Sequence, residues 1–142
     1  MTEAAIPPPP AGFIPSPGRP TGYIAHNGPY FEGPDGDETV QRAFYPLTRH
    51  TNGLGIVHGG MLSAFADTLL AKAVFRKTGK VAVTMHLSLD FLNMARVGEW
   101  VIGESRVVRA TNDIVFVEGA LRVGERDVLR ASGIFKLMQR HA

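Results

Sequence analysis

One carboxylate, Asp67, interrupts a run of mostly apolar residues that extends from Met61 to Phe75. The run has the length and composition of a buried helix. On a helix, the neighbours of Asp67 three and four positions away are small or apolar, namely Ser63, Ala64, Leu70 and Ala71. A carboxylate in such surroundings is suited to act as a general base. A structural aspartate, bonded to backbone or to a basic group, explains the residue equally well from this pattern alone.

Two glycines, Gly59 and Gly60, come just before this run. The first N–H groups of a helix have no partner within it, and glycine lets a ligand approach them closely. Such groups could hold a carbonyl oxygen that becomes negative during a reaction. Taken alone, the pair is better explained as steric glycines where a loop meets a sheet. Asn52 and His58 flank this loop; Asn52 could hold a carbonyl or a water, and His58 is more typical of a structural hydrogen-bonding residue than of a base.

The pattern Asn52-x-x-Gly55-x-x-His58-Gly59-Gly60, followed by Asp67, resembles the hotdog-fold acyl-CoA thioesterases. The resemblance is to the phenylacetate-pathway type and the related small thioesterase-superfamily proteins, and it covers roughly residues 48–138. It implies an α+β fold in which a curved antiparallel sheet wraps around one long central helix.

The resemblance also implies roles for individual residues. It assigns carbonyl polarisation to the Gly59 N–H, a carbonyl- or water-holding role to Asn52, and the general base or nucleophile to Asp67. Thr84 matches a Ser/Thr position that orients the water; some relatives carry serine there, which keeps the hydroxyl. The residues expected to contact the substrate are His58, which shapes the loop, Gly60 and Ser63.

The spacing of Gly59 and Asp67 bears on assembly. Eight residues separate them, which is about 12 Å along a helix axis. An attacking water must lie within about 3 Å of both its base and the reacting carbon. One subunit cannot meet this requirement, but two antiparallel helices can, each offering its start to the middle of the other. We therefore expect a homodimer with shared sites, or a tetramer made of two such dimers.

The remaining elements follow from periodicity. Alternation over residues 81–90 predicts a strand whose apolar face carries Val81, Val83, Met85, Leu87 and Leu89. Three further strands are expected as an antiparallel meander at residues 100–110, 113–123 and 128–138. Residues 38–49 predict a strand with a proline, Pro46, of the kind that edge strands tolerate. Residues 23–36 predict one or two short strands with turns at 27–28 and 34–36. Together these elements give a strongly curved sheet around the helix.

The N-terminal residues are rich in proline, with IPPPP and PSPGRP among the first 20. This composition excludes helix and central strand. We expect an arm over residues 1–22, disordered or draped on the surface, and a single domain over residues 23–142. The N-terminal segment over residues 1–42 departs from the family in its length and could narrow the acyl pocket or pack on a neighbour. A polyproline ligand for a recognition domain is the less favoured alternative.

Composition narrows the functional classes. The chain of 142 residues has no cysteine, a formal net charge of +2 and 44% hydrophobic residues. Thiolate chemistry is excluded, and no basic stripe suggests nucleic acid. No run reaches a membrane span, and the N-terminus lacks a signal-peptide pattern, so we expect a cytoplasmic protein without membrane contact. The five histidines are scattered, so no metal site is expected.

The resemblance implies acyl-CoA as the substrate and therefore no separate cofactor. Surface cations would have to hold the nucleotide of coenzyme A, and the candidates are Arg96, Arg106, Arg109, Arg130 and Lys136. A non-catalytic acyl-CoA- or lipid-binding protein of the same fold is the main alternative. A hotdog hydratase is disfavoured, because its different motif with paired aspartate and histidine is not found. The sequence leaves the acyl group open.

Overall fold

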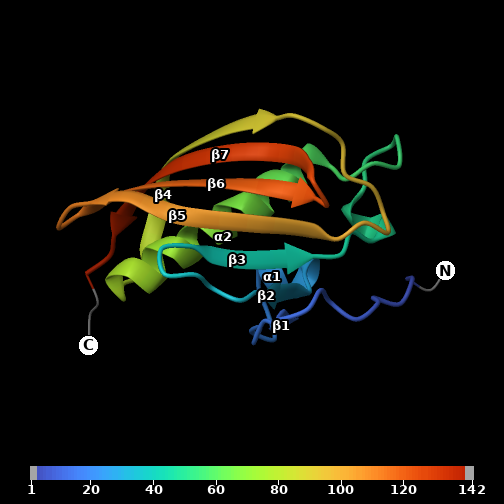
Figure 1. Ribbon diagram of the computed structural model, residues 1–142, viewed down its shortest axis with the longest axis horizontal. Helices are drawn as coiled ribbons and strands as arrows, with labels where there is room; N and C mark the ends of the chain where they lie inside the picture. The colour runs from blue at the N-terminus through green and yellow to red at the C-terminus, as the bar shows by residue number, and fades with distance from the viewer. Residues whose placement is uncertain (1–2, 140–142) are drawn as a thin grey trace.

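The computed structural model describes residues 3–139, so the first two residues of the expected arm and the last three of the expected domain lie outside it. Figure 1 shows one sheet crossed on one face by the long helix α2. The elements in chain order are β1 (Ile14–Pro15), α1 (Tyr23–Asn27), β2 (Tyr30–Glu32), β3 (Val40–Phe44), a 3-10 turn (Thr48–His50), α2 (Gly59–Thr78), β4 (Ala82–Phe91), β5 (Val101–Ala110), β6 (Ile114–Val123) and β7 (Arg126–Leu137). No helix within residues 3–139 is long and apolar enough to cross a membrane.

The seven strands form a single sheet in the order β1-β2-β3-β5-β6-β7-β4, and every neighbouring pair is antiparallel. The expected meander of β5, β6 and β7 is confirmed. The strand that follows the helix, β4, pairs with β7 and forms one edge of the sheet. This is the α+β hotdog architecture that the motif predicts.

The core lies between α2 and the sheet. Buried side chains of the helix include Leu62, Phe65, Leu69 and Leu70. The helix can approach the sheet closely because glycines face it: a Cβ on Gly103 would lie 2.6 Å from a methyl carbon of Leu69. Gly79, with a φ of 70°, ends the helix in the left-handed conformation that glycine favours. The helix itself begins at Gly59, two residues earlier than the apolar run, so both glycines lie in its first turn.

A network of charged side chains connects α2 to the interior strands β2 and β3, so residues 38–49 do not form an edge strand. Arg42 pairs with Glu32 at 2.9 Å and donates to the Thr68 carbonyl of the helix. Lys72, on the helix, lies 2.9 Å from Glu32 and 3.3 Å from Asp35. Burial acts to raise the pKa of Glu32, but the two cations outweigh it and hold that pKa below 4.5. The network fixes the rotation of α2 about its axis and thereby the direction in which its other face points.

The alternation expected along residues 81–90 is wrong in its first half. The pairing of β4 with β7 shifts between Thr84 and His86, so that Met85 is an extra residue, a β-bulge. Beyond the bulge Leu87 and Leu89 face the core as expected. Before it the faces are exchanged: Thr84 turns toward α2, while Val83 and Met85 are 48% and 58% exposed. The physical reason is the period of two, since one inserted residue reverses which side chains face inward.

Residues 23–36, for which one or two short strands were predicted, contain one strand, β2. Residues 23–27 form the helical turn α1 instead of a second strand. Residues 3–22 drape over the sheet face away from α2, which we call the outer face. Phe13 is buried there with Phe31 and Ala43, and Ile6 packs against the same cluster. β1 extends the sheet edge by pairing with β2. Because Ile6 and Phe13 are used in packing, this proline-rich segment is anchored to its own sheet.

Candidate active site

Asp67 and Thr84 meet across the space between α2 and β4. The Thr84 hydroxyl donates a hydrogen bond of 2.5 Å to the Asp67 carboxylate. Asp67 is half-buried and forms no ion pair within residues 3–139. Its other carboxylate oxygen therefore has no protein donor in the described chain. This arrangement argues against a purely structural aspartate neutralised by a basic group and leaves an acceptor available to a water.

Gly59 is the first residue of α2, and its N–H donates to no atom of the described residues. The neighbouring Gly60 N–H is already used, because it donates to Nδ1 of His58 at 2.7 Å. His58 thus caps the helix. The Ser63 hydroxyl donates to the Gly59 carbonyl at 2.7 Å. The two substrate-contact assignments at Gly60 and Ser63 therefore concern groups already bonded within the helix, whereas the Gly59 N–H is free.

Asn52 stabilises the loop that leads to the helix. Its Oδ1 accepts from the Leu54 and Ile56 N–H groups at 2.9 and 3.4 Å. The loop closes through the bridge between Thr51 and Val57. The amide nitrogen of Asn52 makes no hydrogen bond within residues 3–139 and remains able to donate. Its carbonyl end is structural, so only the amide end is compatible with holding a substrate carbonyl.

His50 lies at the start of this loop and bonds it to residues 27 and 47. It is buried; its Nδ1 accepts from the Leu47 N–H, and its Nε2 lies 2.7 Å from the Asn27 carbonyl. Burial lowers the pKa of His50 below 6.5, the Asn27 hydrogen bond acts to raise it, and the Arg49 cation lowers it further. A neutral imidazole, with Nε2–H donating to Asn27, fits both contacts. His50 is therefore a positioning residue for the loop that carries Asn52.

Sequence reasoning missed Phe91, the last residue of β4. Its ring carbons lie 3.6 and 3.8 Å from the position that a Cβ on Gly59 would occupy, so the ring covers the start of α2. The side chain is 53% exposed. The period-two alternation of the sequence could have indicated this position, because Phe91 follows Leu87 and Leu89 at intervals of two. Beyond the bulge, all three side chains therefore lie on the face toward the helix.

The free N–H and the carboxylate stand on the same helix, eight residues apart. The helix rise separates them by about 12 Å, so one chain does not bring them to a common reacting atom. The open edge strand β4 carries Thr84, and its exposed apolar side chains include Val83 and Met85. Both halves of the site therefore border surfaces that are exposed in the single chain.

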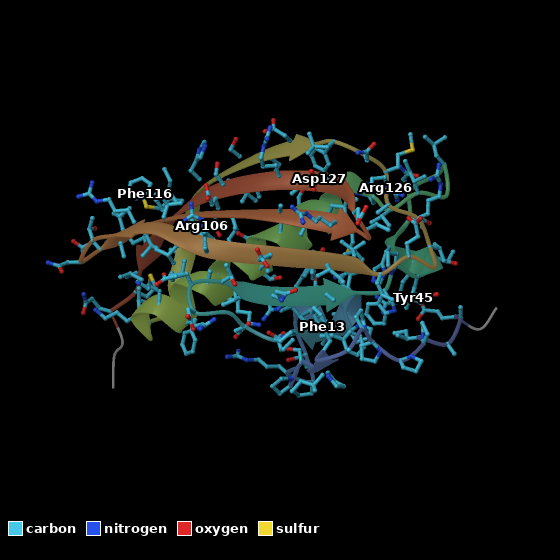
Figure 2. The ribbon with its side chains drawn as sticks, in the orientation of Figure 1. Phe13, Tyr45, Arg106, Phe116, Arg126 and Asp127 are labelled. Carbon is cyan, nitrogen blue, oxygen red and sulfur yellow. The ribbon has the colours of Figure 1, made fainter. Side chains whose placement is uncertain are left out.

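Of the candidate cations, Arg106 and Arg130 lie on the outer face of the sheet, whereas Arg96 lies in the loop between β4 and β5. Arg106 pairs with Glu118 at 2.7 Å and Arg130 lies 3.7 Å from Asp90. These two arginines line an open depression on the outer face, opposite α2 (Figure 2 labels Arg106). Arg96 is different, because its backbone bridges to Ile56 in the loop before Gly59. Residues 3–139 contain no group of three His, Cys, Asp or Glu side chains that could hold a metal ion.

Comparisons with known proteins place this arrangement in a family. The family model of the thioesterase superfamily matches residues 54–129. The Pseudomonas aeruginosa protein named "Putative esterase PA0474" is 38% identical over 112 residues, which cover 78% of this chain and 84% of that protein.

Solved structures agree in fold. A thioesterase protein of Streptococcus pneumoniae solved with coenzyme A has a TM-score of 0.72 at 18% identity, covering 80% of this chain and 91% of its own. The PaaI protein of the Escherichia coli phenylacetic acid degradation operon has a TM-score of 0.67 at 20% identity, covering 71% and 73%. With the match of the family model and the P. aeruginosa relative, these likenesses show that the chain belongs to the thioesterase superfamily and has its hotdog fold.

Proposed function

We propose that this protein is an acyl-CoA thioesterase in which Asp67 activates a water. Family membership supports thioester hydrolysis, and the CoA-bound streptococcal structure supports coenzyme A as the leaving group. The observation that carries the proposal is the Asp67 carboxylate, which is held by the Thr84 hydroxyl and is not neutralised by a cation within residues 3–139. A base needs both features: a fixed direction and a free acceptor oxygen.

The chemical step needs two groups from different subunits. The thioester carbonyl oxygen accepts a hydrogen bond from the Gly59 N–H of one subunit, and the Asn52 amide nitrogen is a second donor for it or for the water. Asp67 of the other subunit takes a proton as the water oxygen attacks the carbonyl carbon. The carbon–sulfur bond then breaks, and coenzyme A leaves as a thiolate, a leaving group that needs no strong general acid. Oxyanion donors of this kind contribute about 10²–10³ in rate.

The proposal includes a homodimer. β4 pairs with β7 on one side only, so its other side is an open edge of the sheet. An open edge strand with exposed apolar side chains is suited to association with another chain. A second copy on this edge would cover Val83 and Met85 and bring the partner's α2 close to the first. Light scattering at micromolar concentration should show a dimer or tetramer. A monomer of 15.4 kDa that still hydrolyses thioesters would contradict the shared site.

The direct test is incubation with a panel of short, medium, branched and aromatic acyl-CoA thioesters, with a thiol reagent to detect free coenzyme A. We expect turnover by the wild-type protein and a large loss in Asp67→Asn. Saturable binding without turnover for every member would instead favour the non-catalytic acyl-CoA-binding alternative. Oxygen esters belong in the panel too, because the P. aeruginosa relative is named as an esterase.

A further inference from the structure

The unassigned aromatic side chain at the start of α2 has a defined environment. Phe91 ends β4, and its ring contacts the position of a Gly59 Cβ at 3.6 Å. That position lies about 2.5 Å from the Gly59 nitrogen, so the ring edge is within about 6 Å of the free N–H. A carbonyl oxygen bound to that N–H would lie about 3 Å from the nitrogen. The ring is therefore an apolar surface within reach of the atoms that would follow the carbonyl carbon.

The strand end that carries the ring is fixed to β7 by hydrogen bonds. Phe91 pairs with Leu129 in the β4–β7 register, and the next two N–H groups both donate to the Val128 carbonyl, at 2.8 and 3.2 Å. The Asn93 side chain donates to the Asp127 carbonyl at 2.7 Å. The backbone that carries the ring is therefore fixed relative to β7 beside the start of α2. Phe91 is 53% exposed, so its ring presents apolar surface that a ligand can cover.

We propose that Phe91 is a specificity-determining residue: its ring forms the wall on which the third and fourth carbons of the acyl chain pack. The inference rests on the proposed thioesterase function, because it places the thioester carbonyl at the Gly59 N–H. Further apolar side chains are exposed along the same end of the molecule and would extend the wall: Leu54, Leu92 and Met94. An acetyl group ends before this wall, whereas a butanoyl group reaches it.

The test compares Phe91→Ala and Phe91→Leu with the matched control Phe116→Ala. Phe116 is also a phenylalanine on a strand, 38% exposed, but it lies near the opposite end of the sheet from the start of α2 (Figure 2). One methylene in a hydrophobic pocket changes kcat/KM by about 10–200-fold. We expect Phe91→Ala to lower kcat/KM for butanoyl-CoA at least about 10-fold and for acetyl-CoA less than about threefold. Phe91→Leu should recover part of the loss, and Phe116→Ala should change neither substrate.

A binding measurement keeps this inference separate from the proposed activity. Ketone analogues of acetyl-CoA and butanoyl-CoA, with a methylene between sulfur and carbonyl, cannot be hydrolysed. Calorimetric titration should show a chain-length-dependent loss of affinity in Phe91→Ala and none in Phe116→Ala. If the wild-type protein binds the analogues but hydrolyses no thioester, the proposed function fails while the wall is still tested. Equal losses for the two chain lengths, no loss, or tighter binding of the longer analogue would overturn the role of Phe91.

Discussion

Replacing Gly59 by proline should remove one hydrogen-bond donor from the site and little else. Gly59 is the first residue of α2, the helix position at which proline is favoured. His58 before it has φ −61° and ψ 135°, an extended conformation that a following proline requires. The lost N–H donates to nothing within residues 3–139. The nearest atoms to a new Cβ are Phe91 ring carbons at 3.6 and 3.8 Å, which is ordinary contact.

These features set opposite expectations for stability and for rate. A proline that fits its site stabilises a protein by about 0.4–1 kcal/mol through the unfolded chain. The free energy of unfolding of Gly59→Pro should therefore equal or exceed that of wild type. Removing one oxyanion donor lowers kcat by about 10²–10³. The adjacent Gly60 N–H cannot take over, because His58 Nδ1 already accepts it.

The matched control is Gly59→Ala. Alanine adds the same Cβ against Phe91 but keeps the N–H, so its kcat should stay within about tenfold of wild type. Free coenzyme A is measured with a thiol reagent on the best substrate of the panel, and folding and assembly are checked by circular dichroism and light scattering. The reasoning is refuted if Gly59→Pro is folded, assembled and as active as Gly59→Ala, because the oxyanion donor is then elsewhere.

Further predictions concern the base, its partner, the shared site and pH. Asp67→Asn should lower kcat by about 10²–10⁴ with acyl-CoA binding kept; retention of more than a tenth of wild-type kcat would make Asp67 structural. Thr84→Ser should leave kcat nearly unchanged, and Thr84→Ala should lower kcat by a smaller factor than Asp67→Asn does. If Thr84→Ser lowers kcat as much as Thr84→Ala, the position needs the methyl group and not the hydroxyl. Subunits carrying Asp67→Ala and subunits carrying Gly59→Pro can be co-expressed with two different tags and purified as mixed dimers. These dimers should have about half of wild-type activity, because one of their two sites is intact. Inactive mixed dimers would refute a site shared between subunits. Because the folded pKa of His50 lies below 6.5, the unfolded state binds the proton first. Stability should fall as the pH drops through the unfolded-state pKa of about 6.5, and His50→Gln should flatten that slope in urea unfolding; an unchanged slope would show that His50 is not its source.

Much of the fold followed from local pattern. The helix end at Gly79 and the meander of β5, β6 and β7 were predictable because glycine and period-two alternation report on neighbouring residues. The segment at residues 23–27 was not, because a five-residue turn carries too little periodicity to separate helix from strand. The pairing of β4 with β7 joins residues far apart in the chain, and no local signal specifies it.

The sequence by itself determined which groups this protein has for its chemistry: a carboxylate at Asp67, a hydroxyl at Thr84, and a pair of glycines just before a helix-length apolar run. These identities and their spacing along the chain are enough to indicate the family and to separate Gly59 from Asp67 along the axis of α2. Only the tertiary structure decided that Asp67 and Thr84 meet, because the bulge at Met85 reverses the inward face of β4. It alone also placed Phe91 over Gly59, since that contact depends on how the strand packs across the helix.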